Sequence, residues 1–262
     1  MADPRVTSII EAFYPGVSGA TAVAESLFGE SCRFSKMPYT LLGANFTTES
    51  VFKDMSMTNP PGRGYRYYRG QNEIVPFGFG LSYTSFSLKW DQATVVAPIV
   101  VTLPASDSTR LLPQQRVGSR GVLRGDDEVL TTVKCVVSNT GLVHGDEIVF
   151  LFHNASAAVQ AWTAATATDH DGGDGAAPPN DPLAIKQLIG FQRVSLAPGA
   201  SETVTFPVSV RKLSTVDRHG VRHTLSGEHS LILSRGHGST LDQLLLLDMG
   251  QAGGAPQRVV LS

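Results

Sequence analysis

The chain lacks most features that would assign it to a specialised class of protein. Its 262 residues include two cysteines, Cys32 and Cys135, which are too few for a disulfide framework and are expected to be buried as small apolar side chains. A net charge of −2 excludes the basic excess of nucleic-acid-binding proteins. No stretch approaches the ~18 apolar residues that a membrane-spanning helix needs. We therefore expect a soluble globular protein with no nucleic-acid partner and no membrane partner.

Signatures of common active sites are also missing. The sequence contains no G-x-S-x-G elbow, no P-loop and no G-x-G-x-x-G turn, so neither a serine-hydrolase triad nor a nucleotide site is indicated. No cofactor is predicted. The first residues, MADPRVTSII, hold no apolar segment of a secretory signal, so the residues themselves leave the localisation unknown.

What the chain does contain is a glycine- and aromatic-rich stretch from Pro61 to Trp90, PGRGYRYYRGQNEIVPFGFGLSYTSFSLKW. Gly78 and Gly80 stand among large aromatic residues, which indicates a backbone that packs closely or takes positive φ. The apolar spacing from residue 83 to residue 90 predicts the first strand of a β domain.

Further strands are predicted downstream of this stretch. Residues 129–137 alternate apolar and polar side chains, as a half-buried strand does. Residues 147–152 are apolar on both faces, which favours a central strand, and residues 93–126 predict a long loop. With the strands expected at 185–194, 202–210 and 227–234 and a hairpin at 213–220, the pattern predicts a sandwich of immunoglobulin type.

Upstream of the glycine-rich stretch, the pattern changes to a mixture of strand and helix. Residues 6–13 predict a strand, residues 20–28 recur at helical spacing with Gly29 at the C-terminal end, and residues 37–42 predict a short strand. Such a unit cannot bury both faces of a parallel sheet. We therefore expect the chain to begin inside a domain, residues 1 to about 60 to be loosely held, and the sandwich from Ser82 onward to fold without them.

Several motifs resemble glycoside hydrolase family 3. YPGVSGATAVAESLFGE before MPYTL, and PGRGYRYYRG before VPFGFGLSYTSF, resemble the end of that family's α/β-sandwich domain; DMSMTNPPGRGYRYYRG is similar to its β-xylosidase branch. NTG before GDE, KQLIGFQRV and LSTVD resemble its C-terminal fibronectin type III-like domain, although His229 stands where an aromatic residue is usual. The implied fold is mainly β. Residues 1–80 would be the remnant of the α/β-sandwich domain with a linking segment, and residues 81–262 a fibronectin type III-like β-sandwich with its core match at about 128–238.

The resemblance also implies a function. Family 3 enzymes are expected to be retaining β-glycosidases that use two carboxylates ~5 Å apart, one on a TIM barrel and one earlier in the α/β-sandwich domain. This sequence has no S-D-W motif and begins too late for either carboxylate, so we expect no catalytic residue in it. Glu11 and Glu25 are expected to be solvated. The implied substrates are β-linked xylosides or glucosides from xylan, and the implied partners of the sandwich are the barrel and the α/β-sandwich domain of the same polypeptide.

A second hypothesis is a free-standing, non-catalytic β-sandwich that binds carbohydrate or another protein. Tyr65, Tyr67 and Tyr68 could stack on sugar rings, since aromatic faces suit the apolar faces of sugars, but packing between domains is the favoured role for this cluster. The sequons at Asn45 and Asn154 fit the extracellular location that the family resemblance implies. Whether either asparagine is glycosylated stays open.

Three histidines offer a possible metal site. His219, His223 and His229 lie close together in the sequence, and histidine is a common zinc ligand. They lie around a predicted hairpin and not on one face of a helix, so no metal is predicted.

The range 155–182 is rich in alanine, aspartate, glycine and proline and is expected to be a disordered insertion between strands. Asp169, Asp171 and Asp174 within it are spaced like the start of a calcium loop. Asn180 occupies the twelfth position where such a loop needs glutamate, so a solvated loop is the favoured interpretation.

Overall fold

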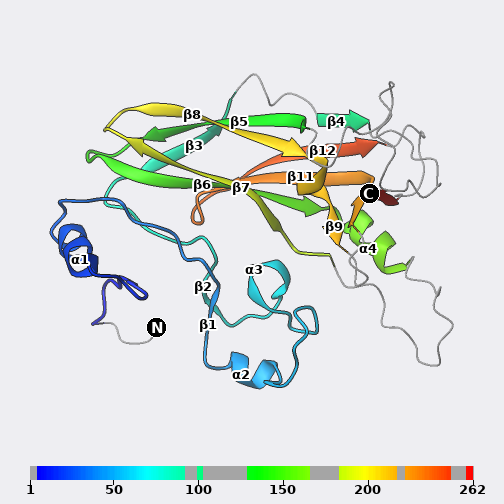
Figure 1. The fold of residues 1–262 in the computed structure, drawn as a ribbon, viewed down its shortest axis with the longest axis horizontal. Helices are drawn as coiled ribbons and strands as arrows, with labels where there is room; N and C mark the ends of the chain where they lie inside the picture. Colours follow the sequence, from blue (N-terminus) through cyan, green and yellow to red (C-terminus); the bar gives the residue numbers. More distant parts are fainter. Residues whose placement is uncertain are drawn as a thin grey trace.

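The computed structural model describes residues 5–91, 99–102, 129–165, 183–216, 222–248 and 258–261. These residues form a mainly β structure in which two sheets lie face to face (Figure 1). The strand order is β4-β12-β11-β6-β7 in the larger sheet and β3-β5-β8 in the smaller one. The strands are β3 (Phe86–Trp90), β4 (Ile99–Thr102), β5 (Val129–Asn139), β6 (Gly145–Ala155), β7 (Gln187–Leu196), β8 (Ser201–Ser209), β11 (Gly227–Ser234) and β12 (Leu241–Asp248).

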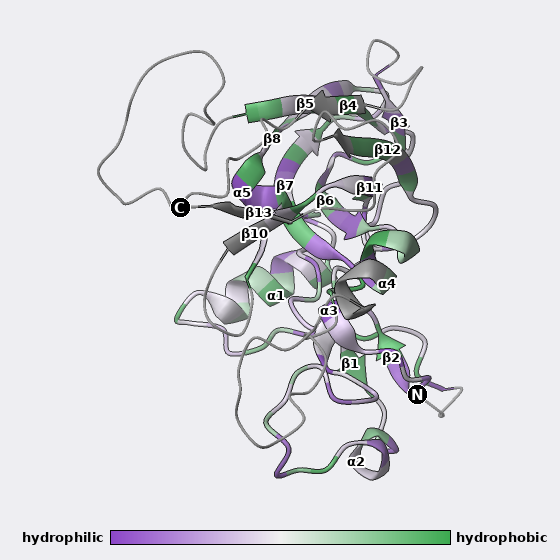
Figure 2. Ribbon diagram, turned by 90° about the vertical axis from the view of Figure 1, so that its right-hand side faces the viewer, coloured by the Kyte–Doolittle hydropathy of each residue, from purple (hydrophilic) through white to green (hydrophobic). Residues whose placement is uncertain are grey.

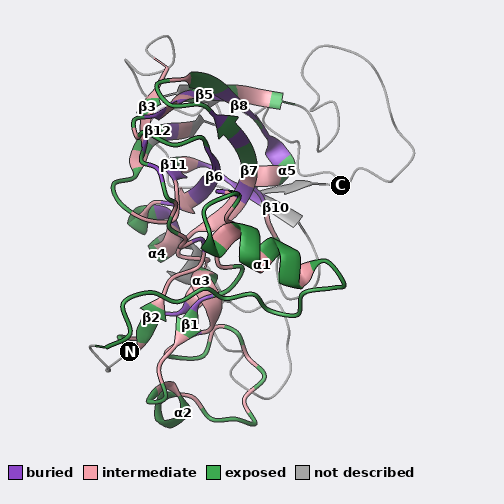
Figure 3. Ribbon diagram, turned by 90° about the vertical axis from the view of Figure 1, so that its left-hand side faces the viewer, coloured by how far each residue is buried: buried purple, intermediate pink, exposed green. Residues whose placement is uncertain are grey.

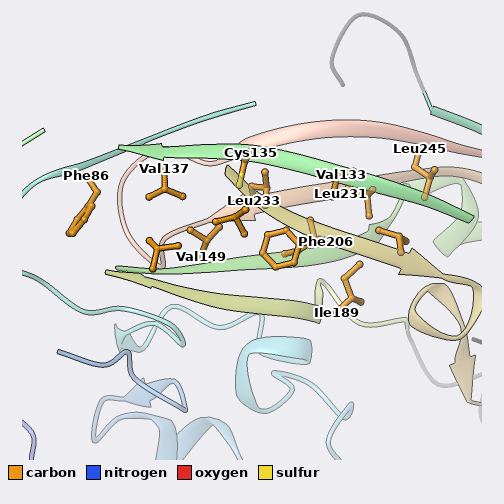
Figure 4. Packing of buried hydrophobic residues seen from close by; sticks show 14 of the residues in the cluster. Phe86, Val133, Cys135, Val137, Val149, Ile189, Phe206, Leu231, Leu233 and Leu245 are labelled. Atoms are coloured by element: carbon orange, nitrogen blue, oxygen red, sulfur yellow. The ribbon is translucent and has the colours of Figure 1, made fainter. Parts of the chain in front are cut away.

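The core between the two sheets is apolar, and its side chains come from both of them (Figure 4). On β5, Val133, Cys135 and Val137 are fully buried, which confirms the predicted alternation. Cys32 is also buried, so the prediction for both cysteines is confirmed. Burial raises the pKa of Cys135 to about 12.

Strand β6 is buried along almost its whole length. It lies between β11 and β7, so the predicted central position is confirmed. Val149 and Leu151 belong to the core between the sheets, whereas Ile148, Phe150 and Phe152 form a second cluster with Tyr65 and Phe77. The strand is therefore apolar on both faces because the segment before the sandwich covers its outer face.

The larger sheet contains strands that the sequence pattern did not reveal. Strand β4 lies inside the range predicted as a long loop and pairs in parallel with β12, for which no strand was predicted. A small third sheet has the order β13-β10-β9, formed by β13 (Arg258–Leu261), β10 (Arg222–Leu225) and β9 (Thr215–Val216). The pairing of β9 with β10 confirms the predicted hairpin. The short helix α5 (Val210–Leu213) precedes it.

Ala157–Ala165 form helix α4, although they fall in the range for which disorder was predicted. The rest of that range, 166–182, lies outside the described residues. Val159 on the helix is buried with Ala155 and Leu225, and this contact explains the order of the helix.

The N-terminal part contains little regular structure. Helix α1 (Gly19–Leu27) is present as predicted, and Gly29 after it has φ 78°. Strand β1 (Leu41–Leu42) pairs with β2 (Glu73–Val75), and short helices α2 (Phe46–Glu49) and α3 (Gly64–Tyr67) lie between them. The strand predicted at residues 6–13 is wrong: these residues form no strand, because no described segment pairs with their backbone.

Exposure separates the N-terminal part from the sandwich. Figure 3 shows exposed residues along α1, α2 and the neighbouring loops, and buried residues along the strands of the sandwich. Figure 2 shows apolar residues in parts of α1 and of the loops around α2. Several large apolar side chains of the N-terminal part are exposed: Val17 is 106% exposed, Phe52 96% and Met55 86%. None of the helices within the described ranges is long and apolar enough to cross a membrane.

Candidate functional site

The residues weighed as catalytic acids do not form a site. Glu11 and Glu25 are both exposed, which confirms that they are solvated. The backbone amide of Phe13 donates to Glu11 at 2.8 Å, a local turn contact. Within the described part of the chain, no group of three histidine, cysteine, aspartate or glutamate side chains is placed to hold a metal ion.

Of the three candidate metal ligands, His229 has a different role. It is buried, and its Nδ1 lies 2.8 Å from Nε2 of His153, while its Nε2 lies 2.9 Å from the carbonyl oxygen of Leu225. The two imidazoles stack with ring centroids 5.0 Å apart beside a cavity of about 20 Å³. Burial, with His229 alongside, lowers the pKa of His153 to about 3. Both rings are therefore held as neutral hydrogen-bonding groups.

The remaining candidates are not brought together. His223 lies on β10, where its backbone pairs with Thr215 and Val260. His219 and the aspartates of the calcium-like spacing, Asp169, Asp171 and Asp174 with Asn180, lie outside the described residues.

The structure does build one organised site, at the junction between the sandwich and the segment that precedes it. We call residues 31–85 the connecting segment. Glu147 at the start of β6 is only 2% exposed and pairs with two cations. Its Oε1 lies 2.7 Å from Nζ of Lys36 in the connecting segment, and its Oε2 lies 3.2 Å from Nη1 of Arg235 after β11. Nζ of Lys36 also donates to the carbonyl oxygen of Gly80 at 2.9 Å.

Burial lowers the pKa of Lys36, and the Glu147 carboxylate offsets part of that effect. A buried charge without a partner is costly, so the arrangement requires all three groups. The lysine thereby holds the connecting segment against the end of the sandwich.

Asp146 makes a parallel set of contacts. Its backbone amide donates to the carbonyl oxygen of Cys32 at 3.2 Å. Its carboxylate accepts from Arg193 at 2.9 Å and from the hydroxyl of Ser195 at 2.7 Å. We refer to Lys36, Asp146, Glu147, Arg193 and Arg235 as the polar clamp. Adjacent acidic residues of one motif, G-D-E, thus engage the connecting segment and β7.

The preceding N-T-G motif fixes the turn that leads into the polar clamp. Asn139 is 1% exposed, and its amide nitrogen donates to the carbonyl oxygens of Val143 (2.8 Å) and Leu196 (2.9 Å). Its amide oxygen accepts from the hydroxyl of Thr84 at 2.7 Å. A side chain at Gly141 would place Cβ 2.2 Å from Oγ1 of Thr84, so only glycine fits.

An aromatic layer lies beside the polar clamp. We define it as Tyr65, Phe77, Phe150 and Phe152. Tyr65 stacks on Phe77 with ring centroids 4.2 Å apart, and Phe77 contacts the rings of Phe150 and Phe152 at 5.9 and 6.2 Å. Nζ of Lys186 lies 5.0 Å from the centroid of Phe152. The layer covers the outer face of β6 with side chains of the connecting segment.

Glycines allow the backbone to approach this layer. Gly78 has φ 84°, and a Cβ there would lie 3.0 Å from the ring of Phe150. A Cβ at Gly236 would lie 1.6 Å from the carbonyl oxygen of Gly78. This close contact confirms the tight packing that the glycines among aromatic residues predicted.

The tyrosine cluster divides between two environments. Tyr65 belongs to the aromatic layer, and Tyr68 is buried, with its hydroxyl donating to Glu49 at 2.9 Å and accepting from the amide of Asn72 at 2.9 Å. Tyr65 therefore packs between the connecting segment and the sandwich, which is the role favoured for the cluster, whereas Tyr68 packs within the connecting segment itself. Tyr67 differs, because it lines a surface hollow.

The two sequons also differ in accessibility. Asn45 is exposed at the start of α2. Asn154 is half-buried in β6, and its side-chain oxygen accepts from Gln160 of α4 at 3.4 Å.

Sequence reasoning missed the cations of the polar clamp. Lys36 stands in FSKMPYT and Arg235 in LSRGHG, and neither context differs from that of a surface residue. The acidic half was visible as part of the G-D-E motif. One signal was available: two adjacent acidic residues begin a strand that is apolar on both faces. Acids in such a position are expected to have buried cationic partners.

Comparisons with known proteins identify a domain family and relatives of the chain. Residues 176–236 match the model of the fibronectin type III-like domain. The chain is 32% identical over 239 residues to Beta-D-xylosidase 1 of Arabidopsis thaliana and 30% identical over 235 residues to the probable exo-1,4-beta-xylosidase bxlB of Aspergillus oryzae. These matches cover 87% and 88% of this chain.

The fold is also similar to solved structures. The structure of a GH3 exo-beta-xylosidase (XlnD) matches with a TM-score of 0.67 and 24% identity over 95% of this chain. The Beta-D-glucoside glucohydrolase of Trichoderma reesei matches with a TM-score of 0.57 over 88% of it. The chain spans only about a quarter of these proteins: 28% and 25% of the two xylosidase sequences, and 28% and 29% of the two solved chains.

Proposed function

Since the chain belongs to glycoside hydrolase family 3, to whose β-xylosidases it is homologous over most of its length, we propose that it is the C-terminal part of a retaining β-D-xylosidase. Its role there is support: the fibronectin type III-like sandwich holds the connecting segment, and through it the catalytic domains. The substrates of the whole enzyme would be β-linked xylosides released from xylan.

The observation that carries this proposal is the polar clamp. Lys36 and the carbonyl oxygen of Cys32 lie far upstream of Glu147 and Asp146 in the sequence, yet each is bonded to one of them. The similarity to the xylosidases runs across both halves of this contact. A free-standing binding module has no need for a buried ion pair to the segment before it.

The proposal places both catalytic carboxylates outside this chain. A retaining glycosidase needs two carboxyl groups ~5 Å apart, and the acids that the structure buries near the junction, Asp146 and Glu147, are engaged by Arg193, Lys36 and Arg235. Both carboxylates are paired with cations, Asp146 with Arg193 and Glu147 with Lys36 and Arg235, so neither is free to attack a glycosidic bond.

The test is an assay of the purified chain with 4-nitrophenyl β-D-xyloside. We expect no turnover, because loss of the nucleophile removes several orders of magnitude in rate. Release of more than one equivalent of nitrophenol per chain, abolished by Glu147→Gln or Asp146→Asn, would overturn the assignment of these acids to structural support.

A further inference from the structure

A surface hollow of about 240 Å³ lies next to helix α3. Its volume is slightly below the ~300–1,000 Å³ of pockets that take drug-sized ligands, a size that suits one sugar residue. It lies apart from the polar clamp and the aromatic layer, with which it shares no residue. The hollow is lined by Thr58, Pro60, Pro61, Tyr67, Arg69 and Leu183.

The walls of the hollow are held by backbone contacts. The amide of Arg69 donates to the carbonyl oxygen of Pro61 at 2.8 Å, and the amide of Gly62 donates to that of Asn59 at 2.7 Å. A Cβ at Gly62 would lie 2.1 Å from the carbonyl oxygen of Tyr67, so the loop packs directly on α3. A ligand would enter a shape that already exists, and binding would require little ordering of the protein.

The side chains at the hollow offer two kinds of contact. The lining residues include an aromatic one, Tyr67, and apolar ones, Pro60, Pro61 and Leu183. Arg69 is exposed, and its guanidinium group has no ion-pair partner among the described residues. No carboxylate is among the lining residues.

A second guanidinium adds positive charge beside the hollow. That of Arg66 lies 5.4 Å from the centroid of the Tyr67 ring, and its hydrogen-bond partner is the neutral amide of Gln187 at 3.3 Å. The two charged side chains identified at and beside the hollow are therefore both cations, and Tyr67 lies between them in the sequence. Such a site is complementary to a ligand that carries both an apolar ring face and an anionic group.

We propose that this hollow binds a uronic acid residue, with the sugar ring against Tyr67 and the carboxylate on the guanidinium of Arg69. The choice of a sugar rests on the proposed function, whereas the choice of an acidic one rests on the two arginines. The site would bind acidic side branches of a xylan chain outside the catalytic centre.

The test is a titration of the purified chain, followed by NMR or calorimetry, with glucuronosyl xylotriose as the probe and plain xylotriose as the neutral comparison. We expect millimolar affinity for the acidic probe and binding of xylotriose weaker by roughly tenfold, the contribution of a charge-assisted hydrogen bond. Arg69→Gln should abolish that difference, and Tyr67→Ala should weaken both ligands.

Matched controls are Arg211→Gln and Tyr14→Ala, which change an exposed arginine and an exposed tyrosine elsewhere. Equal affinity for the two probes, no detectable binding at about 20 millimolar probe, well above the millimolar dissociation constant expected, or an affinity that Tyr67→Ala leaves unchanged would each overturn the proposal. Binding is measured on this chain alone, so its outcome is independent of whether the chain supports a xylosidase.

Discussion

At the scale of single residues, Glu147 is the point on which the junction depends. Glu147→Gln keeps the shape of the side chain and removes its charge, leaving Lys36 and Arg235 without their shared partner. Breaking a buried ion pair in this way costs about 3–5 kcal/mol. We expect the free energy of unfolding, measured by urea titration, to fall by that amount.

The control for this substitution is Glu202→Gln on β8, where the side chain is exposed and a change within about 0.5 kcal/mol is expected. Equal stability of the Glu147 and Glu202 variants would show that the polar clamp contributes nothing to the fold.

The buried histidine pair predicts a dependence of stability on acid. The folded pKa of His153, about 3, lies below its ordinary value of 6.5, so the unfolded chain binds the proton first. The contribution of neutral His153 to the free energy of unfolding is complete above pH 6.5. It is lost as the pH falls from there toward 3, by up to ~1.4 kcal/mol per pH unit. The residues lining the adjacent cavity bring no other charged side chain to the pair.

The measurement is urea unfolding between pH 4 and pH 7 for the wild type and for His153→Leu/His229→Leu. The double variant should show a shallower loss of stability with acid, since leucine at both positions binds no proton. Parallel curves would assign the acid sensitivity to other groups.

Some of these residues were accessible from the sequence and others were not. Cys32 and Cys135 were predicted to be buried because two thiols in a chain of this kind behave as small apolar groups. His229 was identified as unusual, but its partner His153 lies 76 positions away on β6. The partners of Glu147 escaped notice for the same reason: pairing between distant segments leaves no local pattern.

At the scale of elements, the strands with strict alternation were the predictable ones. Strand β5 faces the core on one side, so its period of two is visible in the sequence. The prediction at residues 6–13 failed because β-branched residues make a strand only where a neighbour supplies hydrogen bonds. Strand β4 was missed because its pairing with β12 is distant in sequence.

The connecting segment changes the expectation for truncation. Sequence reasoning predicted that the sandwich folds without residues before Ser82. None of the nine residues of α1, all of them described, is buried, so removing residues 1–30 should leave the thermal midpoint unchanged. Removing residues 1–74 deletes Lys36 and Tyr65, exposes Phe152, and should lower the midpoint by about 10 °C.

Calorimetry of the two truncated proteins beside the full chain distinguishes these effects. Equal midpoints for all three would restore the original expectation that the sandwich is self-sufficient. A loss already present after removal of residues 1–30 would show that α1 contributes to the fold.

At the scale of the whole molecule, the sandwich and the N-terminal part differ in how far their large apolar side chains are buried. The sandwich buries its core between two sheets (Figure 4), whereas the N-terminal part exposes Phe28, Phe52 and Met55 at 83%, 96% and 86%. Large apolar side chains with this exposure are candidates for contact with another protein or domain. In the enzyme that we propose, these side chains would contact the catalytic domains.

The most direct test of this account is a chimera in which the matching 28% of Arabidopsis Beta-D-xylosidase 1 is replaced by this chain. We predict a soluble protein that hydrolyses 4-nitrophenyl β-D-xyloside, and a Glu147→Gln version that loses activity on mild heating before the parent chimera does. Two results would contradict the claim that this chain supports a xylosidase through its polar clamp. One is an inactive chimera with the same melting temperature as the Arabidopsis enzyme. The other is a chimera whose activity after heating is unchanged by Glu147→Gln.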